Sequence, residues 1–289
     1  MATYLAFLAI GQYQVERGRS PSGLPYLNAF STRLGLYERP AKRSVRRTPS
    51  VVEWESRIYG PYPFHQIGGV VPPFRVGFAL ENQTRPVYSK FFFGGGINMR
   101  VIVHELAHQW FGDSVSVKNW KHIWLNEGFA THAEWLWSRY TGSLRPNQLF
   151  RLMYKHFGRN DDFWKVEVGD PGPRHLFDSP IYIRGAMTLQ AVQNVVGERT
   201  FRRILAAWAK VKAGKNGTTV QFRRLAERLS GRDLRHVFKV WLHTTTKPAA
   251  TKANGYPVGG QQLKLPARER SRVAEMLETT QRLARVERR

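Results

Sequence analysis

The 289-residue chain contains 45 Lys and Arg against 21 Asp and Glu, which gives a formal net charge of +24, and it contains no cysteine. A hydrophobic fraction of 42% excludes a largely disordered chain, and the lack of cysteine excludes disulfides and thiolate metal sites. The charge attracts anionic partners, but no RNA-recognition, zinc-knuckle or phosphate-loop pattern accompanies it. A solvated basic surface is therefore favoured over nucleic-acid binding, and we expect no specific nucleic acid.

The first ten residues are apolar, but they lack the basic flank and the cleavage site of a signal peptide. They are also too short to span a membrane, and no later stretch approaches the ~20 apolar residues that a spanning helix needs. The sequence therefore predicts no membrane span. It leaves the compartment and the oligomeric state open.

The upstream part of the chain is predicted to be irregular, with few helices. The expected elements are, in chain order, a strand over 3–15, a turn-rich linker over 17–25, an exposed basic loop over 40–49, a helix over 51–59 that ends at Gly60, a strand over 74–80 and a loop over 91–96. From residue 101 onward the apolar spacing becomes that of helices.

Six helices are predicted in the downstream part. They cover 101–112, 123–139, 180–196, 201–211, 220–229 and 234–241, with Gly or Asn near several of their ends. The tail after Pro248 begins Gly-rich and polar. It then offers a basic helix with apolar residues on one face, namely Val273, Met276, Leu277 and Leu283.

Residues 104–108 read His-Glu-Leu-Ala-His, the H-E-x-x-H pattern. Residues four apart on a helix lie one turn apart, so His104 and His108 can bind the same Zn²⁺. Glu105 can then contact a metal-bound water without ligating the metal. The alternative for the bare motif is a pair of helix histidines with ordinary hydrogen-bond partners.

A catalytic zinc site needs a third protein ligand, and Glu127 supplies a candidate. Eighteen residues separate it from His108, enough for a second helix to return antiparallel to the first. Glu134 lies seven residues further on, on the same helix face. It could accept a hydrogen bond from a ligand histidine, with a simple carboxylate at the surface or at the edge of the core as the alternative.

With these residues in hand, the chain resembles the M1 family of zinc aminopeptidases, above all its short actinobacterial members. Three segments carry the resemblance, which runs from about residue 1 to about residue 245: Val103–Asp113 with the zinc motif, Trp124–Ala130 with the third ligand, and Ile181–Ala186, which looks like the family's Tyr-x-x-Gly-Ala segment. In addition, Phe78-Ala-Leu-Glu-Asn82 stands where the family has Gly-Ala-Met-Glu-Asn, so Phe78 replaces a glycine.

The fold implied by this resemblance is α+β: a thermolysin-like (gluzincin) catalytic domain with a small, mostly antiparallel sheet upstream and a mostly helical downstream half. Family members begin with a β-rich N-terminal domain, so the chain is expected to start inside the last part of that domain. The implied organisation is a remnant of it over 1–17, the peptidase domain over 18–247 and a basic tail over 248–289.

The function implied by the resemblance is hydrolysis of the N-terminal residue of peptides. One Zn²⁺ is held by His104, His108 and Glu127, and Glu105 acts as general base and then as general acid. The Tyr182 hydroxyl stabilises the oxyanion. Glu81, with Asn82 beside it, binds the free α-amine of the substrate.

Three alternatives stay open at this point. A thermolysin-like endopeptidase would use the same zinc residues without reading the amine. An epoxide hydrolase activity occurs in one branch of the family, but no residue specifically favours it. A truncated, non-catalytic zinc protein would use its basic surface to bind anionic partners.

Overall fold

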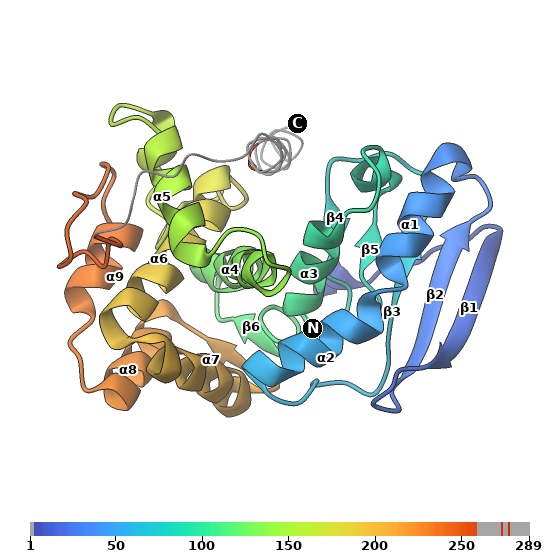
Figure 1. Cartoon of the computed structure of the whole chain (residues 1–289), viewed down its shortest axis with the longest axis horizontal. Coiled ribbons are helices and arrows are strands. Elements are labelled where there is room, and N and C mark those ends of the chain that lie inside the picture. The colour runs from blue at the N-terminus through green and yellow to red at the C-terminus, as the bar shows by residue number, and fades with distance from the viewer. Residues whose placement is uncertain (1–2, 259–272, 274–276, 278–289) are drawn as a thin grey trace. The chain divides into compact units, whose positions relative to one another are not determined.

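The computed structural model describes residues 3–258, 273 and 277, and the chain divides into two compact units. The first unit comprises Met1–Ser116 and Ala209–Asn216. The second comprises Val117–Trp208 and Gly217–Arg289. Figure 1 labels the helices and strands of both.

The first unit is built on a five-stranded sheet. In the order β1-β2-β3-β5-β4, its strands are β1 (Tyr13–Arg19), β2 (Pro25–Ser31), β3 (Ile67–Val71), β5 (Val87–Tyr88) and β4 (Ala79–Leu80). The β1–β2 and β4–β5 pairs are antiparallel, whereas β2–β3 and β3–β5 are parallel. The expectation of a mostly antiparallel sheet is therefore wrong, because the β2–β3 connection contains two helices and returns the chain in the same direction.

Three helices accompany this sheet: α1 (Glu38–Val45), α2 (Thr48–Tyr59) and α3 (Met99–Ala107). The predicted helix over 51–59 is confirmed as α2. Its first turn contains Pro49, where the missing N–H costs nothing, and it ends at Gly60 with φ 98°. Trp54 and Ile58 are buried, as their spacing predicts.

The predicted strand over 3–15 is wrong. Residues Thr3–Leu5 form a short 3₁₀ helix, and β1 begins only at Tyr13. Several of the apolar side chains that suggested a buried strand, among them Leu8 and Ile10, are exposed. The predicted linker over 17–25 is likewise the end of β1, a tight turn and the start of β2.

The predicted basic loop over 40–49 is also wrong, because it contains α1 and the start of α2. Lys42 and Arg43 lie between Ala41 and the pair Ser44 and Val45, which are all buried, so the stretch is an amphipathic helix whose buried face is made of small side chains. Small side chains gave little hydrophobic signal in the sequence.

Two further strand predictions need correction. The expected strand over 74–80 shrinks to the two residues of β4, Ala79 and Leu80. The unpredicted β3 contains Gly68 (φ 156°), where a Cβ would lie 1.8 Å from the carbonyl oxygen of Leu27 on β2. The Phe-rich segment over 91–96 falls in the 3₁₀ helix Lys90–Phe93 and the turn after it.

The second unit is mostly helical. It contains α4 (Trp124–Tyr140), α5 (Pro146–His156), α6 (Ser179–Val196), most of α7 (Glu198–Lys212), α8 (Thr219–Ser230) and α9 (Arg235–Leu242), with 3₁₀ turns at Trp120–His122 and Asp162–Trp164. Five of these helices confirm predictions, and α5 was not predicted. Helix α6 lies at the centre of the second unit: it is buried along most of its length and packs on α4, α5 and α9. Two short strands, β6 (Val115–Val117) and β7 (Lys215–Gly217), form a separate pair.

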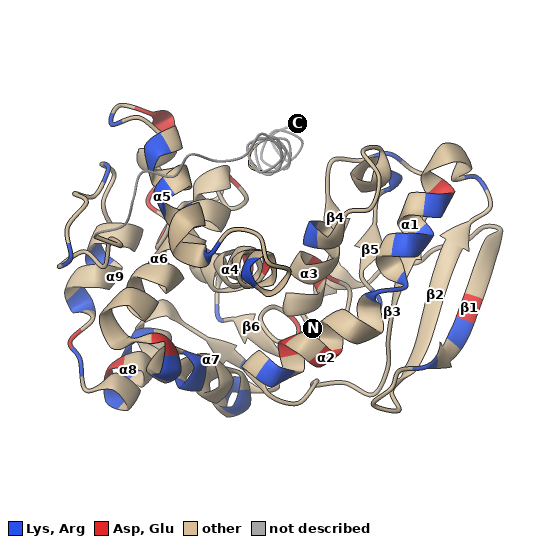
Figure 2. Cartoon of the chain, viewed as in Figure 1, with Lys and Arg blue, Asp and Glu red and all other residues tan. Residues whose placement is uncertain are grey.

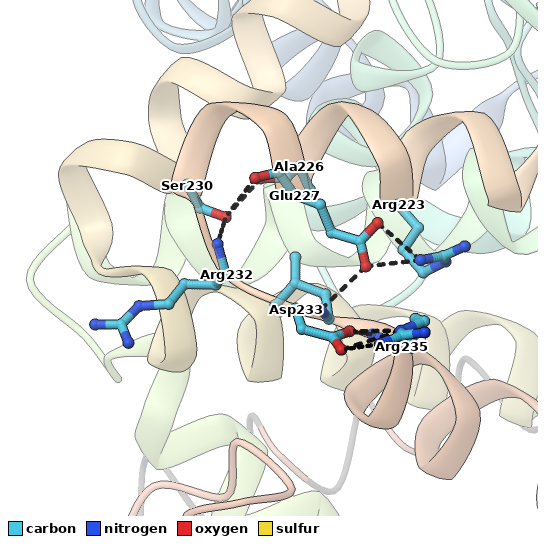
Figure 3. Close-up of polar contacts among 8 residues, drawn as sticks. Arg223, Ala226, Glu227, Ser230, Arg232, Asp233 and Arg235 are labelled. Carbon is cyan, nitrogen blue, oxygen red and sulfur yellow. Dashed lines mark hydrogen bonds and ion pairs between the residues drawn. The ribbon is translucent and has the colours of Figure 1, made fainter.

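A polar network closes the turn between α8 and α9 (Figure 3). Glu227 accepts two hydrogen bonds from Arg223, at 2.6 and 2.7 Å, and one from the Leu234 N–H at 3.1 Å. Gly231 ends α8 in the left-handed conformation (φ 66°). The carboxylate therefore holds one helix in place against the start of the next.

Lys and Arg residues are spread over both units. Figure 2 shows basic residues along α1 and on α7 and α8. Some are paired within their own helix, such as Lys42 with Glu38 at 2.5 Å and Arg202 with Glu198 at 3.0 Å. The basic surface is thus contributed by both units, and its role stays a prediction.

The basic helix predicted for the tail lies almost wholly outside the described residues, which include only Val273 and Leu277 there, both helical. Within the part of the chain that the structure describes, we find no helix with the length and hydropathy of a membrane span.

His132 on α4 is a buried histidine whose protonation should oppose folding. It is 1% exposed, its Nε2 lies 3.1 Å from Gln190 Oε1, and burial lowers its pKa to about 4. The folded state therefore binds fewer protons than the unfolded state, whose histidine pKa is near ~6.5, and stability should fall as the pH drops from ~6.5 to ~4.

We expect this group to lower the free energy of unfolding by about 2 kcal/mol between pH 7 and pH 5. Urea unfolding of the metal-free protein at both pH values measures the change. His132→Gln should reduce this dependence on pH. His65 is exposed, so His65→Gln is the matched control and should leave the dependence unchanged. An equal pH dependence in wild type and His132→Gln would show that His132 is not responsible.

Candidate active site

Helix α3 provides three of the predicted site residues. His104 and Glu105 lie inside the helix and His108 caps its C-terminal end, and all three are buried. The rings of His104 and His108 lie on one face with their centroids 4.9 Å apart. The i, i+4 spacing read from the sequence therefore brings the two imidazoles together as predicted.

The helix ends earlier than predicted, at Ala107 instead of near Gly112. From His108 the chain tightens into turns in which the Asp113 and Ser114 N–H groups donate to the carbonyls of His108 and Gln109. Gly112 has φ 149° in this segment. The turns hold His108 at a helix end, where its ring can be oriented by backbone atoms.

The backbone orients the His108 ring. Its Nδ1 lies 3.0 Å from the Phe111 carbonyl oxygen, which can only accept, so Nδ1 carries the proton and donates. The neutral ring then has a lone pair on Nε2, the arrangement of a metal-binding histidine whose second nitrogen is hydrogen-bonded to the protein. The sequence suggested only Glu134 for such a role; Glu134 is buried on α4, and its role stays a prediction.

Glu127 and Tyr182 both belong to the second unit, on α4 and α6. These helices cross where Gly128 meets Gly185: a Cβ on Gly128 would lie 2.9 Å from the Cα of Gly185, and the reverse distance is also 2.9 Å. Only glycine at both positions allows the backbones to approach so closely. Because Glu127 adjoins Gly128 and Tyr182 lies one turn before Gly185, the crossing sets the placement of both side chains.

Arg184, also on α6, anchors this helix to neighbouring segments. The sequence did not predict this role. The guanidinium is fully buried and forms no ion pair with a carboxylate of the described residues, and burial lowers its pKa to about 10, so it stays charged. It donates instead to oxygens at the ends of two helices: the carbonyls of Trp164 and Val166, of Val240 in α9 and of Thr244 after it, and the Thr244 hydroxyl. Arg184 thereby ties the helix that bears Tyr182 to the end of α9.

The three predicted metal ligands come together. One ligand atom each of His104, His108 and Glu127 lie within 4.8 Å of one another, and all three residues are buried. Two imidazole nitrogens and one carboxylate oxygen form the donor set of many catalytic zinc sites, which keep a fourth position open. The residues present therefore fit a zinc ion.

Glu81 and Asn82 follow the short strand β4, and both are buried, at 7% exposure. Asn82 Nδ2 donates to the Leu5 carbonyl, which anchors this segment to the N-terminal 3₁₀ turn. Phe78, in place of the family's glycine, is partly exposed just before β4. The two residues that the resemblance assigned to amine binding are thus buried, and the three residues before them are partly exposed.

Two buried acids near the zinc motif were not singled out from the sequence. Burial raises the pKa of Asp113 to about 8, helped by the charge of Glu81, and it raises the pKa of Glu55 well above its usual range. The carboxylate oxygens of both lack hydrogen-bond partners among the described residues. Their spacing in the sequence does not indicate that they are buried, because the burial results from the packing of α2 and of the turn after α3.

The comparisons with known proteins fit this geometry. Residues 50–241 match the model of the peptidase family M1 domain. The chain belongs to peptidase family M1. It is 26% identical to aminopeptidase M1-D of Oryza sativa subsp. japonica over 91% of this chain and 31% of that protein, and 27% identical to a leucyl aminopeptidase of Saccharolobus solfataricus over 89% and 34%.

Solved structures give the same family. The M1 zinc metallopeptidase of Deinococcus radiodurans superposes with a TM-score of 0.72 at 26% identity, over 87% of this chain and 55% of that one. The α+β fold class, with a small sheet followed by helices, is thereby confirmed, and the family cofactor is Zn²⁺. The chain spans about a third of the length of its curated relatives and about half of the solved one.

Proposed function

We propose that this M1 family member is a zinc-dependent aminopeptidase. The observation that carries the proposal is the buried group of His104, His108 and Glu127, whose ligand atoms lie within 4.8 Å, with Glu105 beside the first ligand. A single-residue mutant of an M1 zinc metallopeptidase from Deinococcus radiodurans, similar to this chain at 26% identity and a TM-score of 0.68, has been crystallised with a Tyr-Ser-Ala substrate. Peptides are therefore the substrate class that we propose.

In this proposal His104, His108 and Glu127 would hold one Zn²⁺, which would supply Lewis acidity toward the attacking water and the scissile carbonyl. Glu105 takes the proton from the attacking water and later delivers it to the leaving amine. The Tyr182 hydroxyl donates a hydrogen bond to the carbonyl oxygen as negative charge develops on it. His108 is held for its task by the Phe111 carbonyl.

Glu81 makes the proposed enzyme an exopeptidase. Its carboxylate pairs with the protonated α-amine of the substrate, a charge that an internal peptide bond does not offer. The segment 78–82 and the zinc helix α3 belong to the same compact unit. Binding of the α-amine by Glu81 would thus place the first peptide bond at the metal, whatever the side chain of the N-terminal residue.

Removal of a ligand tests the metal assignment. His104→Ala, His108→Ala and Glu127→Ala should each lose the bound zinc that the wild type retains after dialysis, because two protein ligands hold zinc far more weakly than three. Atomic spectroscopy on purified protein measures the zinc content. His122→Ala removes an equally buried histidine, bonded to Thr219, and should keep the metal; full zinc content in the ligand variants would refute the assignment.

Glu81→Gln tests the aminopeptidase proposal. Wild type should cleave a leucine aryl amide with a free amine and leave its N-acetylated form intact. The variant should lose about 100-fold in kcat/KM on the free-amine reporter, since a charged hydrogen bond of ~2–3 kcal/mol is weakened. Glu198→Gln, a surface carboxylate paired with Arg139, is the matched control.

The outcomes separate the candidate functions. Equal cleavage of the free and acetylated reporters would instead indicate an endopeptidase. Zinc-loaded protein that cleaves neither would indicate a non-catalytic zinc protein. Either result would overturn the aminopeptidase proposal.

A further inference from the structure

Gln109, the residue after His108, has a fully buried amide side chain with three polar neighbours. Its Oε1 accepts from the Thr84 N–H at 2.7 Å and lies 3.3 Å from the Tyr62 hydroxyl. Its Nε2 donates to the Glu81 carbonyl at 3.3 Å. Both ends of the amide are therefore engaged, and two of the three contacts are with the turn that follows β4.

That turn is held in an unfavourable conformation. The Arg85 N–H donates to the Asn82 carbonyl, which closes the turn, and Thr84 has φ 69°. Among the described residues, Thr84 is the only one other than glycine with positive φ, a conformation that β-branched side chains disfavour. The Gln109 acceptor bonds the N–H of this residue and so helps to keep the turn closed.

The two contacts need a primary amide at this distance. One atom must accept from Thr84 and another must donate to Glu81, which glutamine does with its Oε1 and Nε2. A carboxylate lacks the donor, and methionine has the length but neither polar group. The Gln66 side chain accepts from Arg85 in the same turn at 2.6 Å, whereas the Gln109 side chain bonds the Glu81 backbone.

We propose that Gln109 is a positioning residue for Glu81. Gln109 directly follows His108, a proposed zinc ligand, and its side chain bonds the backbone of Glu81. One buried side chain thus fixes the distance between Glu81 and the metal site. The inference rests on the proposed function, in which Glu81 binds the α-amine. It predicts that loss of Gln109 weakens recognition of the amine and leaves the proton transfers of Glu105 intact.

The test compares Gln109→Met, which removes both polar groups, with Gln109→Glu, which keeps the acceptor. The matched control is Gln190→Met, because Gln190 is also buried (1% exposed) and bonded to three polar side chains, on α6 in the other unit. Each zinc-loaded protein is assayed on the free-amine leucine reporter. Binding of L-leucine and of N-acetyl-L-leucine is measured by calorimetry.

Gln109→Met should raise KM and the Kd of L-leucine about 10-fold to 100-fold, with kcat within about threefold of wild type and zinc content unchanged. Binding of N-acetyl-L-leucine should not change, and Gln109→Glu should lie between Gln109→Met and wild type. In a Glu81→Gln background, Gln109→Met should add little. Gln190→Met should leave KM unchanged even if it lowers stability.

Three results would overturn the proposal: an unchanged Kd for L-leucine in Gln109→Met, an equal effect of Gln190→Met, or full additivity with Glu81→Gln. Hydrogen exchange of the Thr84 amide gives a readout that needs no activity. It should accelerate in Gln109→Met, and unchanged exchange would also overturn the proposal. A wild type that binds acetylated and free leucine alike would instead contradict the proposed function itself, so the two failures are distinguishable.

Discussion

Replacing Glu105 by Gln is expected to lower kcat by about 10²-fold to 10⁴-fold while the protein keeps its zinc. The substitution preserves the length and shape of the side chain on α3 but removes the group that can take a proton from water. Glu105 is buried and stands between the two proposed histidine ligands, His104 and His108, in the sequence, but it is not itself a proposed ligand. Zinc affinity and catalysis should therefore separate in this variant.

Steady-state kinetics on the leucine reporter and atomic spectroscopy on the same sample measure the two quantities. Glu227→Gln is the control. Glu227 lies on α8, and its carboxylate bonds the turn between α8 and α9 and is not part of the proposed site. Wild-type kcat in Glu105→Gln would remove Glu105 from the proton transfers. Loss of zinc in this variant would show that Glu105 supports the metal site and would leave the general-base role without its distinguishing evidence.

Alanine at Gly128 or Gly185 should lower the free energy of unfolding by about 1–3 kcal/mol. A Cβ at either position would lie 2.9 Å from backbone atoms of the other helix, and backbone cannot move aside as a flexible side chain can. The helices must separate, although alanine itself favours a helix by ~1 kcal/mol over glycine. Because Glu127 and Tyr182 flank the crossing, kcat/KM should fall about 100-fold if they shift by ~1 Å.

Urea unfolding and reporter kinetics on each variant check this prediction. Gly158→Ala is the matched control, since a Cβ there meets nothing within 4 Å and Gly158 does not have positive φ. We expect it to keep wild-type activity. Stable, fully active Gly128→Ala and Gly185→Ala variants would show that the close crossing does not set the site.

The fold was predictable from the sequence mainly where it is helical. Long apolar periodicities gave α2, α4 and the helices from α6 onward to within a few residues. The sheet was largely missed, because β3 is rich in glycine and β1 is mostly exposed, so neither shows the alternation expected of a half-buried strand. Helix α1 was missed for a related reason, since Ala41 and Ser44 on its buried face carry little hydrophobic signal.

The candidate metal ligands were predictable as a group because each stands in a short motif. One helical turn places His104 and His108 on one face, and Glu127 stands in an Asn-Glu-Gly segment with 18 residues between it and His108. The residues that support them were not, because their contacts link distant parts of the chain. Gln109 reaches back 25 residues to Thr84, and Arg184 reaches forward 60 residues to Thr244. Only the folded chain shows what these side chains contact.

The most direct test of the central claim is a product analysis of one peptide of about ten residues, incubated with the metal-free protein before and after addition of one equivalent of Zn²⁺. Mass spectrometry should show no cleavage without zinc. With zinc it should show a ladder of products that lack one, two and then more residues from the N-terminus, as expected if His104, His108 and Glu127 hold the ion and Glu81 reads the amine. Internal cleavage, or an intact peptide in the presence of bound zinc, would contradict the account.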